Sequence, residues 1–261
     1  MDLLIISVSA LAASCLTLFS GFGLGTLLTP VFALFFPIAT AVAMTAVVHL
    51  ANNLLKIGLV GRDAHWPTVI RFGLPAALAA VLGAFTLSLV SGLPPWFEYE
   101  FWGALRQVTP IKASVGMVIV VFALLELSPA FARLSFPLRW LTLGGLVSGF
   151  FGGLSGKQGA IRSAFLVKAG LSKEAYVGTG ALCTVLVDVV RLAVYGSMLG
   201  THLLMVERDR TGLAVLVATG SAFVGAYFGK RLLKKVTLRA VELAVATMMV
   251  LIGSGLASGL L

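Results

Sequence analysis

Lys157, Gln158 and Arg162 place two cations and an amide close together in the second half of the chain. They lie beside Gly156 and Gly159, where glycines interrupt an otherwise apolar stretch. The first N–H groups of a helix are unpaired and carry the positive end of its dipole, so a helix that starts beside Lys or Arg suits an anion. We therefore interpret Lys157, Gln158 and Arg162 as candidate substrate-binding residues. The alternative is that both cations lie at a membrane interface and face lipid phosphates.

The first half contains a similar interruption, with glycines at positions 21, 23 and 25. Gly23 and Gly25 would let an oxyanion approach backbone N–H groups closely, although these glycines could equally serve close packing of helices. The apolar piece that follows, Thr26–Phe36, contains Pro30 and covers about half of a 30 Å hydrocarbon core at about 1.5 Å per residue. Short, glycine-interrupted apolar segments in corresponding halves indicate the binding site of a transporter.

Four strongly polar residues lie inside the apolar run Ile38–Val60, namely His49, Asn52, Asn53 and Lys56. Spacings of three and four place His49, Asn52 and Lys56 on one helix face. Such a face is costly in hydrocarbon and is expected to look into the protein or a wet cavity. We predict that Asn52 and Asn53 contact the substrate and that His49 takes part in coupling. The alternative is that the asparagines bond neighbouring helices and that Lys56 reaches the headgroups.

A later apolar run carries Asp188 and Arg191, three residues apart. The two side chains could simply neutralise each other in a structural salt bridge. A carboxylate or histidine inside a membrane is nevertheless the usual carrier of protons, and histidine normally changes charge nearest neutral pH. We therefore assign His49, Asp188 and Arg191 as candidate coupling residues.

The composition identifies a polytopic membrane protein. Of the 261 residues, 59% are hydrophobic and only 11% are charged, whereas soluble domains are about 25% charged. The net charge of +9 lies in short connections between apolar runs. Its expected counterpart is therefore membrane lipid rather than nucleic acid.

We expect no cofactor, no metal site and no enzyme activity. The three histidines, His49, His65 and His202, are scattered, and no nucleophile–base pair is evident. Cys15 and Cys183 each stand alone in an apolar run, as small buried residues do. Because no ATPase signature is present, active transport would have to use an ion gradient or a separate subunit.

The apolar runs predict an all-α polytopic membrane protein with two inverted repeats, each of about four full spanning helices plus one short broken or re-entrant helix. The repeats are expected at residues 1–127 and 128–261. The short pieces are Thr26–Phe36 and Ala160–Ala169. The polar connection Pro94–Arg106 is interpreted as an amphipathic outer piece. The full-length candidates are Leu3–Gly21, Ile38–Val60, Thr68–Ser91, Pro110–Leu127, Leu138–Gly153, Lys173–Gly200, Thr211–Gly229 and Leu238–Leu260.

Loop charge distinguishes two topologies. If the short pieces count as crossings, one face holds eleven basic residues: Arg62, Arg71, Arg133, Arg139, Lys168, Lys173, Lys230, Arg231, Lys234, Lys235 and Arg239. The opposite face then holds four: Arg106, Lys112, Arg208 and Arg210. If the short pieces do not cross, the basic residues of 230–239 change face and the asymmetry fades. The positive-inside rule therefore predicts ten segments with both termini outside.

Both interruptions and their flanks resemble the sulfite exporter TauE/SafE family, also called the 4-toluene sulfonate uptake permeases. The resemblance rests on GFGLGTLLTPVFALFFP followed by ATAVAMTAVV, and on GLVSGFFGGLSGKQGAIRSAFLVKAGLSKEAYVGTGAL. In this family a glycine-rich break, a short apolar piece with a proline and a small-residue helix start occur once in each half. The chain departs from that pattern at Ala164, where a proline is frequent, and at Lys157-Gln158, which replaces part of a glycine run.

The resemblance implies a secondary transporter of a sulfur-containing anion, sulfite or a sulfonate, coupled to protons or other ions. It implies a multi-pass protein of a bacterial-type cytoplasmic membrane, with a homodimer as a candidate assembly. Members of the family include exporters and importers, so the direction of transport stays open. The alternatives are an anion channel with the same site chemistry and a carrier of a non-sulfur organic anion.

Overall fold

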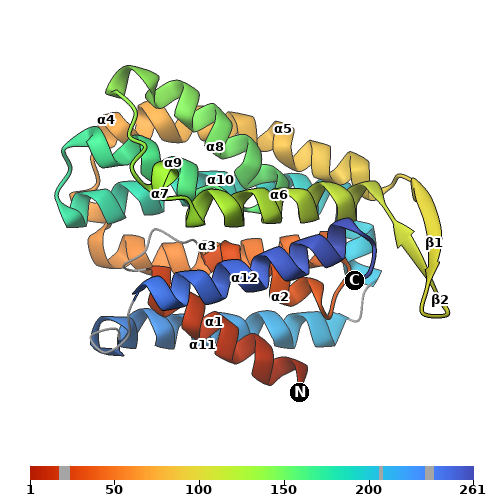
Figure 1. Ribbon diagram of the computed structural model, residues 1–261. Coiled ribbons are helices and arrows are strands. Elements are labelled where there is room, and N and C mark those ends of the chain that lie inside the picture. Colours follow the sequence, from red (N-terminus) through yellow and green to blue (C-terminus); the bar gives the residue numbers. More distant parts are fainter. Residues whose placement is uncertain (18–23, 206–207, 233–237) are drawn as a thin grey trace.

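The computed structural model describes residues 1–17, 24–205, 208–232 and 238–261, which form a bundle of helices with one β-hairpin at an end (Figure 1). The helices are α1 (Asp2–Thr17), α2 (Leu24–Ala33), α3 (Ile38–Val60), α4 (Trp66–Thr68), α5 (Leu74–Ser91), α6 (Pro110–Leu127), α7 (Pro129–Ala132), α8 (Leu141–Ser155), α9 (Gly159–Leu166), α10 (Lys173–Met205), α11 (Arg208–Leu232) and α12 (Leu238–Ala257). Four short turns of other helix types are η1 (Gly61–Asp63), η2 (Val69–Gly73), η3 (Leu138–Trp140) and η4 (Val167–Ala169), and the strands are β1 (Phe97–Phe101) and β2 (Ala104–Val108).

Within the described ranges, four helical stretches are long and apolar enough to cross a membrane: Ile38–Asp63, Trp66–Ser91, Pro110–Leu127 and Lys173–Met198. Shorter apolar helices cover Asp2–Cys15, Leu24–Ala33 and Leu243–Ala257. The predicted helical membrane architecture is confirmed at this level. The inverted relation between the two halves stays a prediction.

Local chemistry sets several helix boundaries. α3 and α6 begin and end at the predicted residues, and each begins where proline marks the first turn or the residue before it. The Thr109 side chain also caps α6 by accepting a hydrogen bond from the Lys112 N–H at 3.4 Å. At the end of α8, Gly156 adopts a left-handed conformation with φ of 79° and donates its N–H to the Gly152 carbonyl. A left-handed glycine is a common way to end a helix.

The polar connection near residue 100, which was predicted as an amphipathic outer piece, is a β-hairpin. Aromatic Phe97, Tyr99 and Phe101 alternate with Glu98 and Glu100 at the period of a strand. The two-residue turn at 102–103 has positive φ at both positions, 51° and 71°, as a tight antiparallel turn requires. The hairpin also holds the C-terminus, because Tyr99 donates its hydroxyl hydrogen to the Ser258 carbonyl at 2.6 Å.

The predicted span Leu138–Gly153 is helical in the structure, as η3 followed directly by α8, and it continues past the predicted end to Ser155. α8 has 15 residues and covers about 22 Å at about 1.5 Å per residue. Its end is set by Gly156, and the chain then turns back as α9. The second half therefore places two short helices in succession, as the first half does with α1 and α2.

Small residues bring the helices into close contact. Gly145, Gly149 and Gly153 form a stripe on α8, and a Cβ at Gly149 would lie 1.9 Å from the Ala76 carbonyl oxygen of α5. Gly225 of α11 approaches the Leu11 carbonyl of α1 in the same way. Since lipid is as apolar as a leucine side chain, such close backbone approach is a main source of helix association in membranes. α6 packs on α12, and α3 packs on α10.

The bundle has two distinct ends. The terminal end carries the β-hairpin and the C-terminus, and the N-terminus lies on this side as well (Figure 1). The basic end carries the connections that follow α3, α6 and α9, where the exposed basic residues are Arg62, Arg71, Arg133, Arg139, Lys168 and Lys173. Lys234 and Lys235 lie outside the described residues.

Two helical hairpins enter the bundle from opposite ends. The first hairpin consists of α1 and α2; Asp2 at its start and Phe36 after it line one pocket at the terminal end. The second hairpin consists of α8 and α9; the rings of Phe136 before it and Phe165 inside it stack at 4.4 Å at the basic end. Each hairpin returns the chain to the end from which it entered, so each short helix acts as a return segment.

Candidate functional site

The tips of the two hairpins meet inside the protein. A Cβ at Gly25, in the first turn of α2, would lie 3.3 Å from the Gly156 carbonyl oxygen. The Lys157 ammonium donates a hydrogen bond to the Thr26 carbonyl at 2.6 Å. Lys157 is 2% exposed. The two interruptions predicted from glycine and proline are therefore neighbours, and Lys157 joins them. Gly23 lies outside the described residues.

The meeting point contains the N-termini of two helices. α9 begins at Gly159 and presents its first, unpaired N–H groups near the tip of the second hairpin, and the described part of α2 begins at Leu24. Gln158, the residue before α9, is buried, and its Nε2 has no hydrogen-bond partner among the described residues. Its backbone carbonyl accepts from Ser148 at 3.1 Å, which fixes the chain at this turn. Two positive dipole ends, a buried cation and an unused amide N–H all favour a negative charge.

His49, Asp188 and Arg191 form a buried ionic triad between α3 and α10. The His49 Nδ1 lies 2.9 Å from one carboxylate oxygen of Asp188. Arg191 contacts the other oxygen through Nε at 2.9 Å and Nη2 at 2.7 Å. The triad residues are at most 6% exposed. The structure thus joins the three predicted coupling residues directly.

The triad also touches the second hairpin. Arg191 donates from Nη1 to the Gly152 carbonyl of α8 at 3.2 Å, and a Cβ at Gly156 would lie 2.7 Å from the same Nη1. The hydroxyl of Tyr195 donates to the neighbouring Gly153 carbonyl. Tyr195 thereby pairs the Gly153 carbonyl near the end of α8, and Arg191 gives the Gly152 carbonyl a second donor beside the Gly156 N–H. A change in the charge or position of the triad would therefore alter contacts at the tip of the second hairpin.

The two predicted asparagines have different surroundings. Asn53 donates from its amide to the His49 carbonyl one turn earlier at 2.8 Å. Asn52 accepts from the Ser14 hydroxyl of α1 at 3.3 Å, while its Nδ2 has no hydrogen-bond partner among the described residues. Asn52 therefore links α3 to the first hairpin, and its amide NH₂ group stays unpaired among the described residues.

Arg162 does not take part in the contact between Lys157 and the Thr26 carbonyl. It points from α9 toward α10, where it donates to the Thr184 hydroxyl. It is close enough to Lys56 of α3 for the two charges to interact. The predicted anion site is thus divided into a tip region with Lys157 and Gln158 and a second cationic region with Arg162 and Lys56.

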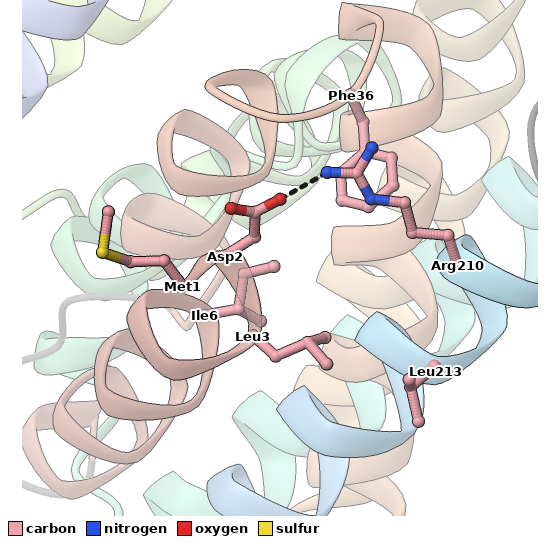
Figure 2. Close-up of a pocket in the computed structure, with 7 residues that line it drawn as sticks. All are labelled: Met1, Asp2, Leu3, Ile6, Phe36, Arg210 and Leu213. Atoms are coloured by element: carbon pink, nitrogen blue, oxygen red, sulfur yellow. Dashed lines mark hydrogen bonds and ion pairs between the residues drawn. The ribbon is translucent and has the colours of Figure 1, made fainter.

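A pocket of about 250 Å³ opens at the terminal end. Figure 2 shows Asp2 of α1 and Arg210 of α11 facing each other across it, joined by an ion pair. The Arg210 guanidinium also lies over the Phe36 ring, 5.7 Å from its centroid. These contacts fix the start of α1, the chain after α2 and the start of α11 at one end of the bundle.

The whole chain can now be compared with known proteins. A profile of the sulfite exporter TauE/SafE family matches residues 6–256. The chain belongs to this family. No curated protein matches the chain. Membership of TauE/SafE confirms the resemblance noted from the two interruptions and establishes an integral membrane protein from a family of sulfite-type anion transporters.

Sequence reasoning missed the groups that complete the site of this TauE/SafE protein. Ser14 and Thr184 bind the predicted site residues Asn52 and Arg162, and Tyr195 binds the Gly153 carbonyl of the second hairpin. A hydroxyl in a membrane helix gives no signal of its own. The Thr26 carbonyl was predictable, since proline at position 30 removes its usual helical donor. No group of three or more His, Cys, Asp or Glu that could hold a metal occurs in the described parts of the chain.

Proposed function

We propose that this TauE/SafE protein is a secondary transporter that binds a sulfite or sulfonate anion between the two hairpin tips and couples its movement to protons. The observation that carries the proposal is the meeting of two half-helix N-termini at a buried lysine, Lys157. Discontinuous helices whose N-termini face an anionic group are the recurrent binding device of secondary transporters. The family supplies the class of substrate.

The geometry suits an oxyanion with several equivalent oxygens. Backbone N–H groups at the starts of α2 and α9 can each bond one oxygen, and Gln158 Nε2 can bond another. Gly25 leaves room for this approach because it carries no side chain. Lys157 supplies a full positive charge to offset that of the anion.

A carrier fits the structure better than a channel. Lys157 and Gln158 are each 2% exposed, so the anion reaches them only when the tips separate. Tips that enter from opposite ends can open one at a time, which is the requirement of alternating access. The reciprocal packing of α5 on α8 and of α1 on α11 supports the predicted inverted repeats, since corresponding helices exchange roles in the two pairs.

The buried triad supports proton coupling. When His49 takes a proton, it adds positive charge beside Asp188 and Arg191, and Arg191 contacts the tip of the second hairpin. Positive charge near the tip favours an anion there, so proton and anion bind cooperatively. Arg162 and Lys56 provide a further cationic step on the route of the anion.

Binding and flux of the reconstituted protein test the proposal. Lys157→Met is expected to weaken the binding of sulfite or of an aromatic sulfonate by at least about tenfold, the value of one charge-assisted hydrogen bond. Lys173→Met, which changes an exposed lysine, is the matched control. Wild-type affinity in Lys157→Met would contradict the tip site. A substrate flux without accompanying proton flux would favour the channel.

A further inference from the structure

Pro30 creates an unusual hydrogen-bond acceptor at the tip of the first hairpin. It lies inside α2, and its nitrogen carries no hydrogen. In an α-helix the N–H of residue 30 would bond the carbonyl of residue 26. The Thr26 carbonyl therefore lacks its helical partner, although Thr26 is buried. A buried carbonyl without a donor is costly, so a partner from elsewhere in the chain is needed.

The partner is Lys157 of the other half. Its ammonium donates a short hydrogen bond of 2.6 Å to the Thr26 carbonyl, and an ionised donor strengthens and shortens such a bond. A carbonyl stabilises an ammonium without neutralising it, so the positive charge of Lys157 stays available to an anion. Glu126 of α6 also interacts electrostatically with Lys157.

The two halves differ at this point. A spacing of 134 residues relates Gly25 to Gly159, and the same spacing relates Pro30 to Ala164. Ala164 has a backbone N–H, so α9 can satisfy its own carbonyls where α2 cannot. Lys157 precedes α9, which has alanine at the position equivalent to Pro30. Pro30 lies in α2, and glycine occupies position 23, which the same spacing relates to Lys157. The pair is thus built across the interface between the hairpins.

We propose that Pro30 is a positioning residue for Lys157. By freeing the Thr26 carbonyl, Pro30 gives the ammonium a resting partner that holds the two tips together in the empty carrier. When the tips separate, the transported anion takes the place of this carbonyl on Lys157. This inference rests on the proposed function, because it takes Lys157 as the anion ligand.

Restoring the missing N–H tests this role. Pro30→Ala supplies a helical donor for the Thr26 carbonyl, which then competes with Lys157. With its resting partner weakened, Lys157 is expected to bind an aromatic sulfonate about tenfold more tightly, the value of one hydrogen bond to a charged group. The return of the empty carrier should slow, so net uptake into proteoliposomes falls relative to substrate exchange. Pro110→Ala is the matched control, because the first position of a helix needs no N–H.

A double-mutant cycle in thermal unfolding provides a readout without ligand. If Pro30 acts through Lys157, Pro30→Ala should raise the unfolding temperature more in the Lys157→Met background than in the wild type. In that background the restored N–H gains a bond and disturbs no ammonium. Equal effects in both backgrounds would overturn the proposal.

The outcomes separate this inference from the proposed function. Unchanged sulfonate binding in Lys157→Met would refute the anion site itself. Loss of binding in Lys157→Met, beside wild-type affinity and a wild-type ratio of net uptake to exchange in Pro30→Ala, would refute only the role of Pro30. Pro30→Gly also restores the N–H and serves if Pro30→Ala does not express. Failure of both variants to fold would count against the proposal, since each is expected to keep α2 helical.

Discussion

Asp188 carries two partners that differ in whether their charge can change. The Arg191 guanidinium also bonds the Gly152 carbonyl near the end of α8, whereas the His49 imidazole can gain or lose a proton. Truncation of Arg191 would leave a buried carboxylate without its fixed cation, at a cost of about 3–5 kcal/mol. Arg191 therefore has a structural part in the triad, and His49 is the residue that can respond to pH.

At the residue scale, we predict that anion affinity rises as pH falls and that His49 causes this dependence. Protonation adds positive charge near the tip, so the wild type should bind an aromatic sulfonate about tenfold more tightly at pH 5 than at pH 8. Such a sulfonate keeps its charge over this range. The groups around His49 that share the electrostatic field are Asp188, Arg191 and Lys56. His49→Gln should bind with a flat pH profile in a calorimetric titration.

The exposed His65, which bonds Thr68, provides the comparison for this measurement. His65→Gln should keep the wild-type profile. If His49→Gln kept a pH dependence of wild-type size, or if affinity in the wild type rose with pH, the assignment of His49 would be wrong.

At the scale of the helices, glycine residues determine how closely neighbouring helices pack. The α5–α8 contact depends on backbone approach along the stripe of Gly145, Gly149 and Gly153, which holds the second hairpin in place. α8 cannot move sideways without losing this contact. The stripe therefore fixes where the tip of the second hairpin stands, and hence where Lys157 lies.

We expect Gly149→Ala to destabilise the protein, although alanine is the better helix former. Its Cβ would lie 1.9 Å from the Ala76 carbonyl oxygen, so the helices must separate, at a cost of about 1–3 kcal/mol. Thermal unfolding in detergent measures the effect. Gly220→Ala is the matched control in α11, because its Cβ would meet nothing within 4 Å. Gly220→Ala should stabilise slightly or leave stability unchanged. Equal behaviour of the two variants would contradict the packing role of Gly149.

At the scale of the whole molecule, exposed basic residues are concentrated at the basic end. Both termini lie on the side of the terminal end, as the ten-segment topology predicts (Figure 1). The two termini share a side because the first hairpin returns the chain to the end where α1 began. We predict from the positive-inside rule that the basic end lies in the cytoplasm.

Cysteine labelling in intact cells tests this orientation. Single cysteines at Glu98 in the β-hairpin and at Arg210 should react with a membrane-impermeant maleimide, whereas those at Arg62 and Arg139 should react only after permeabilisation. The wild type is the control, since Cys15 and Cys183 are buried. The opposite pattern would invert the topology. Reaction at all four positions in intact cells would contradict a two-faced membrane protein.

Local patterns predicted much of the fold. The spans Ile38–Val60 and Pro110–Leu127 agree to the residue, because length, apolar composition and proline at their starts act within the segment itself. The strands at 97–108 were missed, although their alternation of aromatic and acidic residues and the turn at Gly103 are local signals. The end of the span Leu138–Gly153 was placed too early, because α8 continues to Ser155 and is ended only by the left-handed conformation of Gly156.

The sequence by itself determined that the chain is a helical membrane protein with two interruptions, and it identified the residues beside them. Glycine, proline and buried charge act through the backbone and through the cost of desolvation, which depend little on distant residues. Only the tertiary structure decided the partners: Lys157 bonds Thr26, and His49 bonds Asp188. These contacts join residues more than a hundred positions apart. They exist because two hairpins enter from opposite ends and meet, an arrangement fixed by helix packing rather than by any local pattern.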